Sequence, residues 1–431
     1  MVTQMRIYVK GFGCSSSLAD AEVLAGVLRD AGHSIVRSRD SAELLVYNTC
    51  AVKAPTEDRI ISLLKRVSNK KLIVAGCLPL VNFERLRREV RFDGVVGPAF
   101  GEGIVDVVRE VSQGLYVESL ENGSMNTPPL DLPRERVNPA ISIIPISYGC
   151  LGSCSYCCVR FARGKLRSYH AGEIRRKVER DIEKGVQEFW LTSQDTACYG
   201  QDIGTSLAAL MKEICSVGGD FLVRVGMMTP NNLLRIFDEV MEAFRSERFF
   251  KFLHLPVQSG NEDVLRRMNR TYSVNDFTMI VRSFRTLFPR STVATDIIVG
   301  FPGESDEAFK DTCELVSEVK PDIVNVSKFF ARPKVPAGGL GQQVLPSELK
   351  RRSSLLAGLV RRIALERNSD WVGWCGRVFV DEMGIRDSVV GRNFAYKPVV
   401  IKDMDGKSLL RRFVHVKIVD GLQSHLLGVV V

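Results

Sequence analysis

The chain contains no run of about 18 consecutive apolar residues, so no membrane-spanning helix is expected, although 45% of its residues are hydrophobic. The first residues, MVTQMRIYVKGFG, are too short in their apolar part for a signal peptide and are typical of a strand. Histidine is scarce, with five residues. The eleven cysteines are an odd number for a disulfide framework, and intracellular enzymes more often use cysteine for metal binding or catalysis. We therefore expect a cytoplasmic protein.

Three cysteines stand close together within ISYGCLGSCSYCCVRFARGKLRSY, residues 146–169. Cys150, Cys154 and Cys157 have the spacing C-x3-C-x2-C, which allows one loop to hold a single metal centre. Iron–sulfur clusters usually take four cysteines, so three leave one iron open, and an open metal position is where a substrate can bind. The alternatives are a chance grouping or a zinc knuckle, which needs a fourth ligand. The nearest histidine, His170, lies well past the loop.

Strand and helix patterns alternate over residues 1–115, which predicts a parallel sheet with helices on its faces. Cys14, Cys50 and Cys77 each stand where one of three successive predicted strands ends. Because the carboxyl ends of parallel strands share one edge and bind ligands there, we expect these thiols to converge on a second cluster, again with one open iron. The alternative is three core cysteines, since cysteine is often buried.

Both cysteine patterns resemble the radical S-adenosylmethionine (SAM) methylthiotransferases, and the likeness covers the whole chain. The matching segments of the first domain are GFGC at 11–14, NTCAVK at 48–53, PTED at 55–58 and AGC at 75–77. The resemblance implies two [4Fe–4S] clusters. One, at Cys150, Cys154 and Cys157, binds SAM and cleaves it to methionine and a 5′-deoxyadenosyl radical. The other, auxiliary cluster carries or transfers sulfur. The family usually has Asn where this chain has Ser17.

Residues 116–140 are rich in proline and polar residues and are predicted to be a linker. Residues 141–369 contain six strand–helix units, which predict an open, partial (β/α)6 barrel, as the resemblance also implies. Polar residues and glycines follow the strands, where they can contact SAM or be ordinary turn residues. An aromatic residue between the cluster cysteines contacts adenine in many relatives. The predicted SAM contacts are Tyr156, Ser193, Gln194, Asp195, Gln258, Gly300 and Phe301.

Short β-patterned runs over residues 370–431 predict a small antiparallel barrel. From Lys350 onward there are 15 Lys or Arg and 8 Asp or Glu, so most of the chain's net charge of +9 lies here, which suits nucleic acid. GRNFAY at 391–396 resembles the G-R-x-x-x-Y of the TRAM domain. The predicted RNA contacts, which can instead be solubilising charges, are Arg163, Arg167, Arg332, Arg392, Lys397, Arg411, Arg412 and Lys417.

The resemblance implies an enzyme that inserts sulfur at an unactivated C–H bond and then methylates it. NTCAVKAPTED and TSQDTACYG are most similar to the archaeal and eukaryotic branch that acts on threonylcarbamoyladenosine (t6A) in tRNA, 3′ of the anticodon. We therefore expect tRNA, an electron donor and a sulfur donor as partners, and no membrane. Because the chain stops after a predicted strand, the archaeal type is favoured. The alternatives are methylthiolation of isopentenyladenosine or of a ribosomal-protein aspartate, and a non-catalytic RNA-binding protein with structural clusters.

Overall fold

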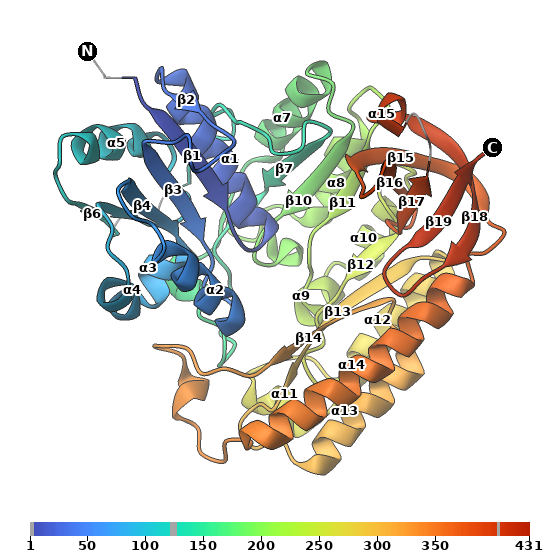
Figure 1. Ribbon diagram of the computed structural model, residues 1–431. Helices are drawn as coiled ribbons and strands as arrows, with labels where there is room; N and C mark the ends of the chain where they lie inside the picture. Colours follow the sequence, from blue (N-terminus) through green and yellow to red (C-terminus); the bar gives the residue numbers. More distant parts are fainter. Residues whose placement is uncertain (1–3, 121–126, 403–405) are drawn as a thin grey trace.

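The computed structural model describes residues 4–120, 127–402 and 406–431. The first part is a six-stranded parallel sheet in the order β2-β1-β3-β4-β5-β6 (Figure 1). Alternate residues of its central strands are buried on opposite faces, as a sheet covered on both sides requires. On one face α1 and α5 cover Leu44 and Val46, and on the other α2 to α4 cover Leu45 and Tyr47. The bounds are β1 Arg6–Gly11, α1 Ser15–Asp30, β2 Ser34–Ile35, β3 Leu44–Thr49, α2 Ala54–Leu64, β4 Lys71–Gly76, α3 Cys77–Val81, α4 Phe83–Glu89, β5 Gly94–Val96, η1 Gly101–Gly103, α5 Ile104–Ser112 and β6 Val117–Ser119.

The predicted boundary of this domain at residue 115 is too early, because β6 is the edge strand of the same sheet. The chain that follows is not a free linker either. Leu132 is buried against α1 and α5, and Glu135 donates its backbone N–H to the carbonyl of Glu22. Residues 132–135 of the predicted linker therefore pack against the first domain, and its residues 121–126 lie outside the described residues.

The second part is a partial barrel of six parallel strands in two sheets, β7-β10-β11 and β12-β13-β14. Backbone hydrogen bonds from Val223 to Arg248 and from Phe250 to Val223 connect β11 to the approach of β12. Helices cover the outer face, which confirms the predicted open barrel. The bounds are β7 Ile141–Pro145, β8 Ser147–Tyr148, α6 Val159–Arg163, β9 Arg167–Ser168, α7 Ala171–Glu183, β10 Glu188–Thr192, η2 Thr196–Cys198, α8 Leu207–Cys215, β11 Leu222–Val225, α9 Pro230–Leu234, α10 Phe237–Phe244, β12 Phe252–His254, α11 Glu262–Arg267, α12 Val274–Leu287, β13 Thr292–Val299, α13 Asp306–Val319, β14 Ile323–Lys328, η3 Pro336–Gly339 and α14 Pro346–Ser369.

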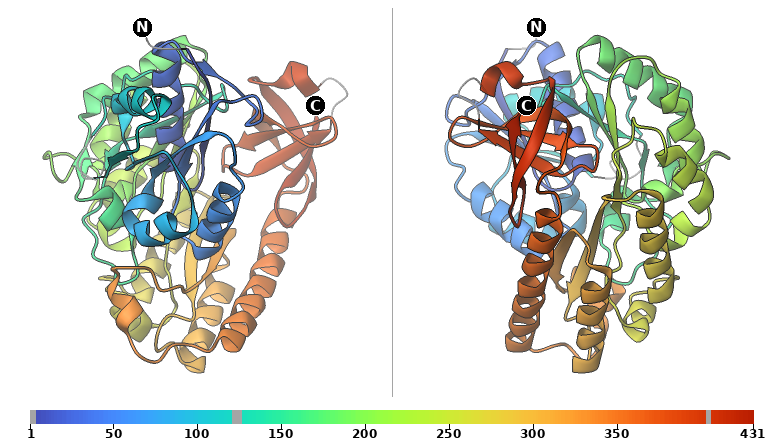
Figure 2. Two further views of the ribbon diagram at one scale, coloured as in Figure 1. Left: turned by 60° about the vertical axis from the view of Figure 1, so that its left-hand side comes forward. Right: turned by 90° about the vertical axis from the view of Figure 1, so that its right-hand side faces the viewer.

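Helix α14 leads from the partial barrel to a closed five-stranded barrel in the order β15-β16-β17-β19-β18 (Figure 2). The prediction of a wholly antiparallel barrel is wrong at one pair, because β17 and β19 run parallel. Among the described residues no helix is long and apolar enough to span a membrane. The bounds are β15 Cys375–Met383, β16 Ser388–Asn393, β17 Pro398–Lys402, α15 Gly406–Leu409, β18 Phe413–Gly421 and β19 Leu426–Val430.

The two flanking domains share the inner face of the partial barrel. Leu18 and Ala19 of α1 pack on Ile141 and Ile143 of β7, beside Phe379 of the small barrel. At the amino ends of the strands Tyr396 of the small barrel lies against Phe250 and Phe252, with ring centroids 4.8 and 5.2 Å away. One end of the partial barrel is therefore closed by side chains, and the carboxyl ends of its strands face the first domain.

Candidate active site on two adjoining cysteine loops

The structure brings Cys14, Cys50 and Cys77 to one edge of the first sheet, as predicted. They follow β1, β3 and β4, which are direct neighbours. Gly13 has a φ of +107°, and a Cβ atom there would lie 2.5 Å from Cys50 Cβ and 2.8 Å from its Sγ. Only glycine allows the two loops to approach so closely.

Asn48, two residues before Cys50, ties this edge to helix α1. Its side-chain amide donates to the carbonyl of Ser17 at 2.6 Å and lies 3.1 Å from the Ser17 hydroxyl. Ser17 therefore still accepts hydrogen bonds from Asn48 at the position where the family usually has Asn, so this difference in sequence leaves the contact between α1 and β3 in place.

Burial makes these thiols reluctant to ionise. It raises the pKa of Cys50 and raises that of Cys77 to about 12, against the opposing charge of Arg163 and with the help of the neighbouring thiols. Metal ligation needs the thiolate, so a bound cluster has to supply the compensating positive charge.

The second triad lies in the loop after β8. The backbone N–H of Gly152 points to Cys150 Sγ at 3.2 Å. Burial raises the pKa of Cys150 to about 11 and that of Cys157 to about 12, and the nearby Cys154 thiol acts in the same direction. Ser155 anchors the loop by donating its N–H to the Met268 carbonyl at 3.0 Å. Met268 begins the segment MNRTY, residues 268–272, so this segment holds the cysteine loop in place.

Both triads fit a cluster with one open iron. Each offers three free thiols from loops at the ends of parallel strands or next to a β-strand, which is the number of ligands that such a cluster takes. The assignment of the six cysteines as cluster ligands remains a prediction that these loops satisfy.

The two cysteine loops adjoin each other. Cys158, next to Cys157, is buried in one apolar cluster with Cys50 and Cys77, and its Sγ lies 3.5 Å from the carbonyl of Ala51. This contact gives Cys158 a packing role between the two loops. The two predicted cluster sites therefore belong to one region of the molecule.

Arg163 connects the two loops electrostatically. It ends α6, only six residues after Cys157, and its Nη2 lies 2.7 Å from Asp20 Oδ2 of α1. Tyr148 donates its hydroxyl to the other oxygen of Asp20 at 3.0 Å. Arg163 is 2% exposed and lies among Asp20, Tyr148 and Cys77, so it connects the two domains from within, and its contact with RNA remains a prediction.

Among the predicted SAM contacts, Gln258 has the geometry most typical of a functional residue. It is a non-glycine residue with a φ of +70°, which costs free energy and is common at ligand sites. Its Oε1 is buried without a hydrogen bond in the described structure, as is Oε1 of Gln194. Tyr156 lies edge-on to Phe301, with ring centroids 6.5 Å apart, and its hydroxyl meets Arg270. The SAM contacts of these four residues remain predictions.

Three other predicted SAM residues have internal roles. Asp195 is 1% exposed and accepts hydrogen bonds from Ala197, Thr229 and Asn232 through both oxygens, so it ties strand ends together, and its contact with SAM remains a prediction. The Ser193 hydroxyl accepts the Asp195 N–H at 3.1 Å. Gly300 has a φ of +75°, and a Cβ atom there would lie 2.1 Å from Leu349 Cδ1, so helix packing requires this glycine.

Three further predicted RNA contacts are buried in ion pairs, two of them between domains. Arg332 pairs with Glu57 of α2, and Lys397 lies 2.9 Å from Asp322. Arg392 is mostly buried, 3.4 Å from Asp381 and over the Tyr396 ring. Burial gives these three cations a structural role, and their RNA contacts remain predictions. Arg167 is half-buried, and Arg411, Arg412 and Lys417 are exposed, so their RNA contacts remain predictions.

The sequence analysis missed the acidic partners of these cations. Asp20 lies inside the largely apolar and buried SLADAEVLAGVL of α1, which is a signal for a buried ion pair. Glu57 lies in PTED, a segment that matches the family, and is 0% exposed. It also missed the polar side chains His254 and Asp296, which meet at 3.0 Å inside the partial barrel.

Comparisons with known proteins agree with this geometry. A profile of the radical SAM superfamily matches residues 144–316, and one of the uncharacterized protein family UPF0004 matches residues 6–97. The solved radical SAM methyltransferase TsrM from Kitasatospora setae has a TM-score of 0.55 at 15% identity, and the match covers 78% of this chain and 75% of that one. At this identity the likeness concerns the fold alone.

Curated relatives are closer in sequence. The probable threonylcarbamoyladenosine tRNA methylthiotransferase of Pyrococcus abyssi is 43% identical over 92% of this chain and 93% of its own length. The one of Methanothermobacter thermautotrophicus is 41% identical over 98% and 99%. The Xenopus laevis threonylcarbamoyladenosine tRNA methylthiotransferase is 36% identical over 98% of this chain and 76% of its own length. The chain therefore belongs to the threonylcarbamoyladenosine tRNA methylthiotransferase family of the radical SAM superfamily.

Proposed function

We propose that the chain is a radical SAM enzyme that converts t6A next to the anticodon of tRNA to its 2-methylthio derivative. The observation that carries the proposal is the pair of adjoining three-cysteine loops, Cys14/Cys50/Cys77 and Cys150/Cys154/Cys157, at the mouth of a partial barrel. Family membership adds the substrate, since the relatives named above are t6A tRNA methylthiotransferases.

The six cysteines are the residues that would hold the two clusters. When bound, the cluster on the barrel loop supplies the electron that cleaves SAM, and the cluster on the first domain supplies sulfur for the C2 position of adenine. The chain's own residues orient and shield these groups. Tyr156 and Phe301 form an apolar wall beside the barrel loop, and Gln258 presents an unpaired amide oxygen near the ends of β12 and β13.

The reaction also needs partners that the chain does not provide. A low-potential electron donor has to reduce the barrel cluster, and a sulfur donor has to replace the sulfur that each turnover consumes. The substrate class suggests that the enzyme works in the cytoplasm. Arg412 and Lys417 are exposed on the small barrel and suit phosphates of the tRNA.

Mass spectrometry of the nucleosides of a t6A-containing tRNA tests the proposal. The tRNA is incubated with the reconstituted chain, SAM, a reductant and sulfide. We expect 2-methylthio-t6A to appear together with 5′-deoxyadenosine. A product on isopentenyladenosine or on a ribosomal-protein aspartate would replace the proposed substrate. SAM that stays intact on a protein with two loaded clusters would indicate a non-catalytic RNA-binding protein.

A further inference from the structure

The inner face of β13 carries one charged residue between two apolar residues. Its inward residues are Ala294, Asp296 and Ile298, because alternate residues of a strand share a face. Ala294 is buried with Phe250 and Phe252, among the side chains that close the amino-terminal end of the partial barrel. Ile298 packs in the cluster that contains Tyr156 of the cysteine loop. Asp296 therefore lies between these closing side chains and the candidate SAM site.

Asp296 is held by two side chains and stays partly open to solvent. His254 Nε2 lies 3.0 Å from its Oδ2, and Asn325 Nδ2 donates to its Oδ1 at 2.7 Å. The Asp296 side chain is 30% exposed and that of His254 17%, so these groups are accessible from the interior of the barrel. Each carboxylate oxygen can accept two hydrogen bonds, so Asp296 has acceptor capacity left for a ligand.

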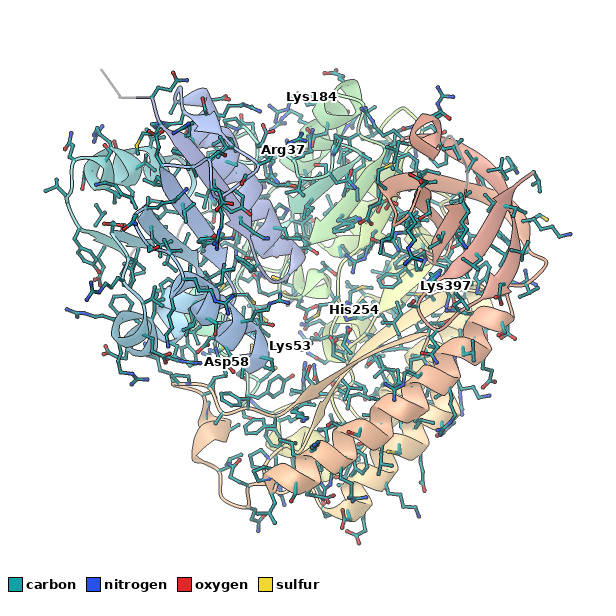
Figure 3. The ribbon with its side chains drawn as sticks, in the orientation of Figure 1. Arg37, Lys53, Asp58, Lys184, His254 and Lys397 are labelled. Carbon is teal, nitrogen blue, oxygen red and sulfur yellow. The ribbon has the colours of Figure 1, made fainter. Side chains whose placement is uncertain are left out.

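Lys53 lies across from this group on the first domain. It precedes α2 and comes three residues after Cys50, so it stands at the rim of the sulfur-bearing loop. Figure 3 shows Lys53, just before α2, and His254, at the end of β12, close together in this view, which agrees with the electrostatic effect of Lys53 on Asp296. Lys53 is exposed, and its ammonium group makes no ion pair or hydrogen bond with the described residues. Its charge nevertheless reaches Asp296: burial opposes ionisation there, but the His254 and Asn325 hydrogen bonds and Lys53 hold the pKa of Asp296 below its ordinary value.

The chemistry of t6A matches this arrangement. Its substituent on N6 carries a carboxylate, a hydroxyl group and urea N–H groups, whereas an isopentenyl group is wholly apolar. In adenine, C2 and C6 flank N1, so the substituent on N6 starts beside the atom that receives sulfur. A group that recognises the substituent must therefore adjoin the two cysteine loops. An apolar chain beside Asp296 and Lys53 would desolvate charges without replacing their hydrogen bonds, which is unfavourable.

We propose that Lys53 is the specificity-determining residue that binds the carboxylate of the threonylcarbamoyl group, while Asp296, held by His254 and Asn325, accepts hydrogen bonds from its N–H or hydroxyl groups. This inference rests on the proposed function and adds the recognition site for the substrate. Lys53 has to supply the attraction, since the ionised Asp296 alone would repel a second carboxylate.

A double-mutant cycle on protein and RNA tests the pairing. The affinity of the reconstituted holoenzyme is measured for an anticodon stem–loop carrying t6A and for the same stem–loop carrying the neutral t6A methyl ester. Lys53→Met should weaken binding of the t6A loop about tenfold to hundredfold, the loss typical of a charge-assisted contact, and leave binding of the ester nearly unchanged. Lys53→Arg should restore most of the affinity. Lys184→Met, the same charge change on the exposed end of α7, should affect both RNAs equally and weakly.

The inference would be overturned if Lys53→Met bound both RNAs with the wild-type affinities, or if its affinity fell by the same factor for both. Iron content and the 5′-deoxyadenosine formed by each variant show whether its clusters are intact. The proposed function is tested separately, by measuring the 2-methylthio-t6A that the wild-type enzyme forms. A wild-type enzyme that forms this product while the cycle shows no coupling contradicts the role of Lys53 alone.

Discussion

Arg163 of α6 and Asp20 of α1 form a buried ion pair between the two domains that carry the cysteine loops, with Nη2 2.7 Å from Oδ2 and both side chains 2% exposed. The pair fixes the barrel loop against the sheet edge that carries Cys14 and Cys77. A buried charge that loses its partner is costly, whereas losing both charges together costs much less.

Arg163→Gln should therefore lower the free energy of unfolding by about 3 kcal/mol, because it leaves Asp20 uncompensated. Adding Asp20→Asn should recover part of that loss. Arg160→Gln, on the exposed side of the same short helix, should change stability by no more than about 0.5 kcal/mol. Urea unfolding of the cluster-free protein measures the three variants against the wild type. Equal effects of Arg160→Gln and Arg163→Gln would contradict the importance of the pair.

The ion pair of Arg332 with Glu57 predicts a similar contrast within one helix. Glu57 is 0% exposed and also accepts from Arg85 and Asn82, both at 2.8 Å. Glu57→Gln should lower the free energy of unfolding by about 3 kcal/mol, since Arg332 loses its charged partner. Asp58→Asn, next in the chain but 56% exposed, should cost less than about 1 kcal/mol. Thermal and urea unfolding of the two variants should separate them clearly, and overlapping curves would show that Glu57 does not carry this role.

Glu22 of α1 predicts a pH dependence of stability. Burial raises its pKa to about 7, although Arg134, Arg136 and Lys177 and the Val137 N–H oppose the shift. A folded-state pKa above the unfolded value near 4.5 leaves stability intact below pH 4.5 and removes it as the pH rises to about 7. Glu22→Gln should therefore raise the free energy of unfolding by about 2 kcal/mol at pH 8 and by little at pH 4. The exposed Glu135→Gln should show no such difference in unfolding curves taken across this range, and a pH-independent gain for Glu22→Gln would contradict a raised pKa.

The effect of removing a cation from the small barrel on tRNA binding should depend on whether that cation is exposed. Arg412→Ala and Lys417→Ala remove exposed charges, so each should weaken tRNA binding and reduce the slope of log affinity against log salt by about 1. Lys397→Met should leave that slope unchanged and lower stability instead, because the ammonium group is 3% exposed and bound to Asp322 and Asn368. Filter binding of tRNA over a salt series measures the slopes. A change of slope for Lys397→Met alone would reverse the assignment.

The sequence revealed features that depend on neighbours in the chain. The spacing of Cys150, Cys154 and Cys157 is local, and the strands before Cys14, Cys50 and Cys77 have clear apolar patterns, so both loops could be predicted. Strands β2 and β6, of two and three residues, are too short for any periodicity. Arg163, Arg332 and Lys397 could not be placed from the sequence, because their acidic partners come from other domains. Arg332 and Glu57, for example, are 275 positions apart.

The most direct test compares radical formation with sulfur insertion in Cys50→Ala and Cys154→Ala. Both variants are reconstituted with iron and sulfide and given SAM, a reductant and t6A-containing tRNA, and 5′-deoxyadenosine and 2-methylthio-t6A are measured by mass spectrometry. We expect Cys50→Ala to form 5′-deoxyadenosine but no thiolated nucleoside, and Cys154→Ala to form neither while keeping the auxiliary cluster. Thiolated product from Cys50→Ala, or SAM cleavage by Cys154→Ala, would contradict the division of work between the two cysteine loops.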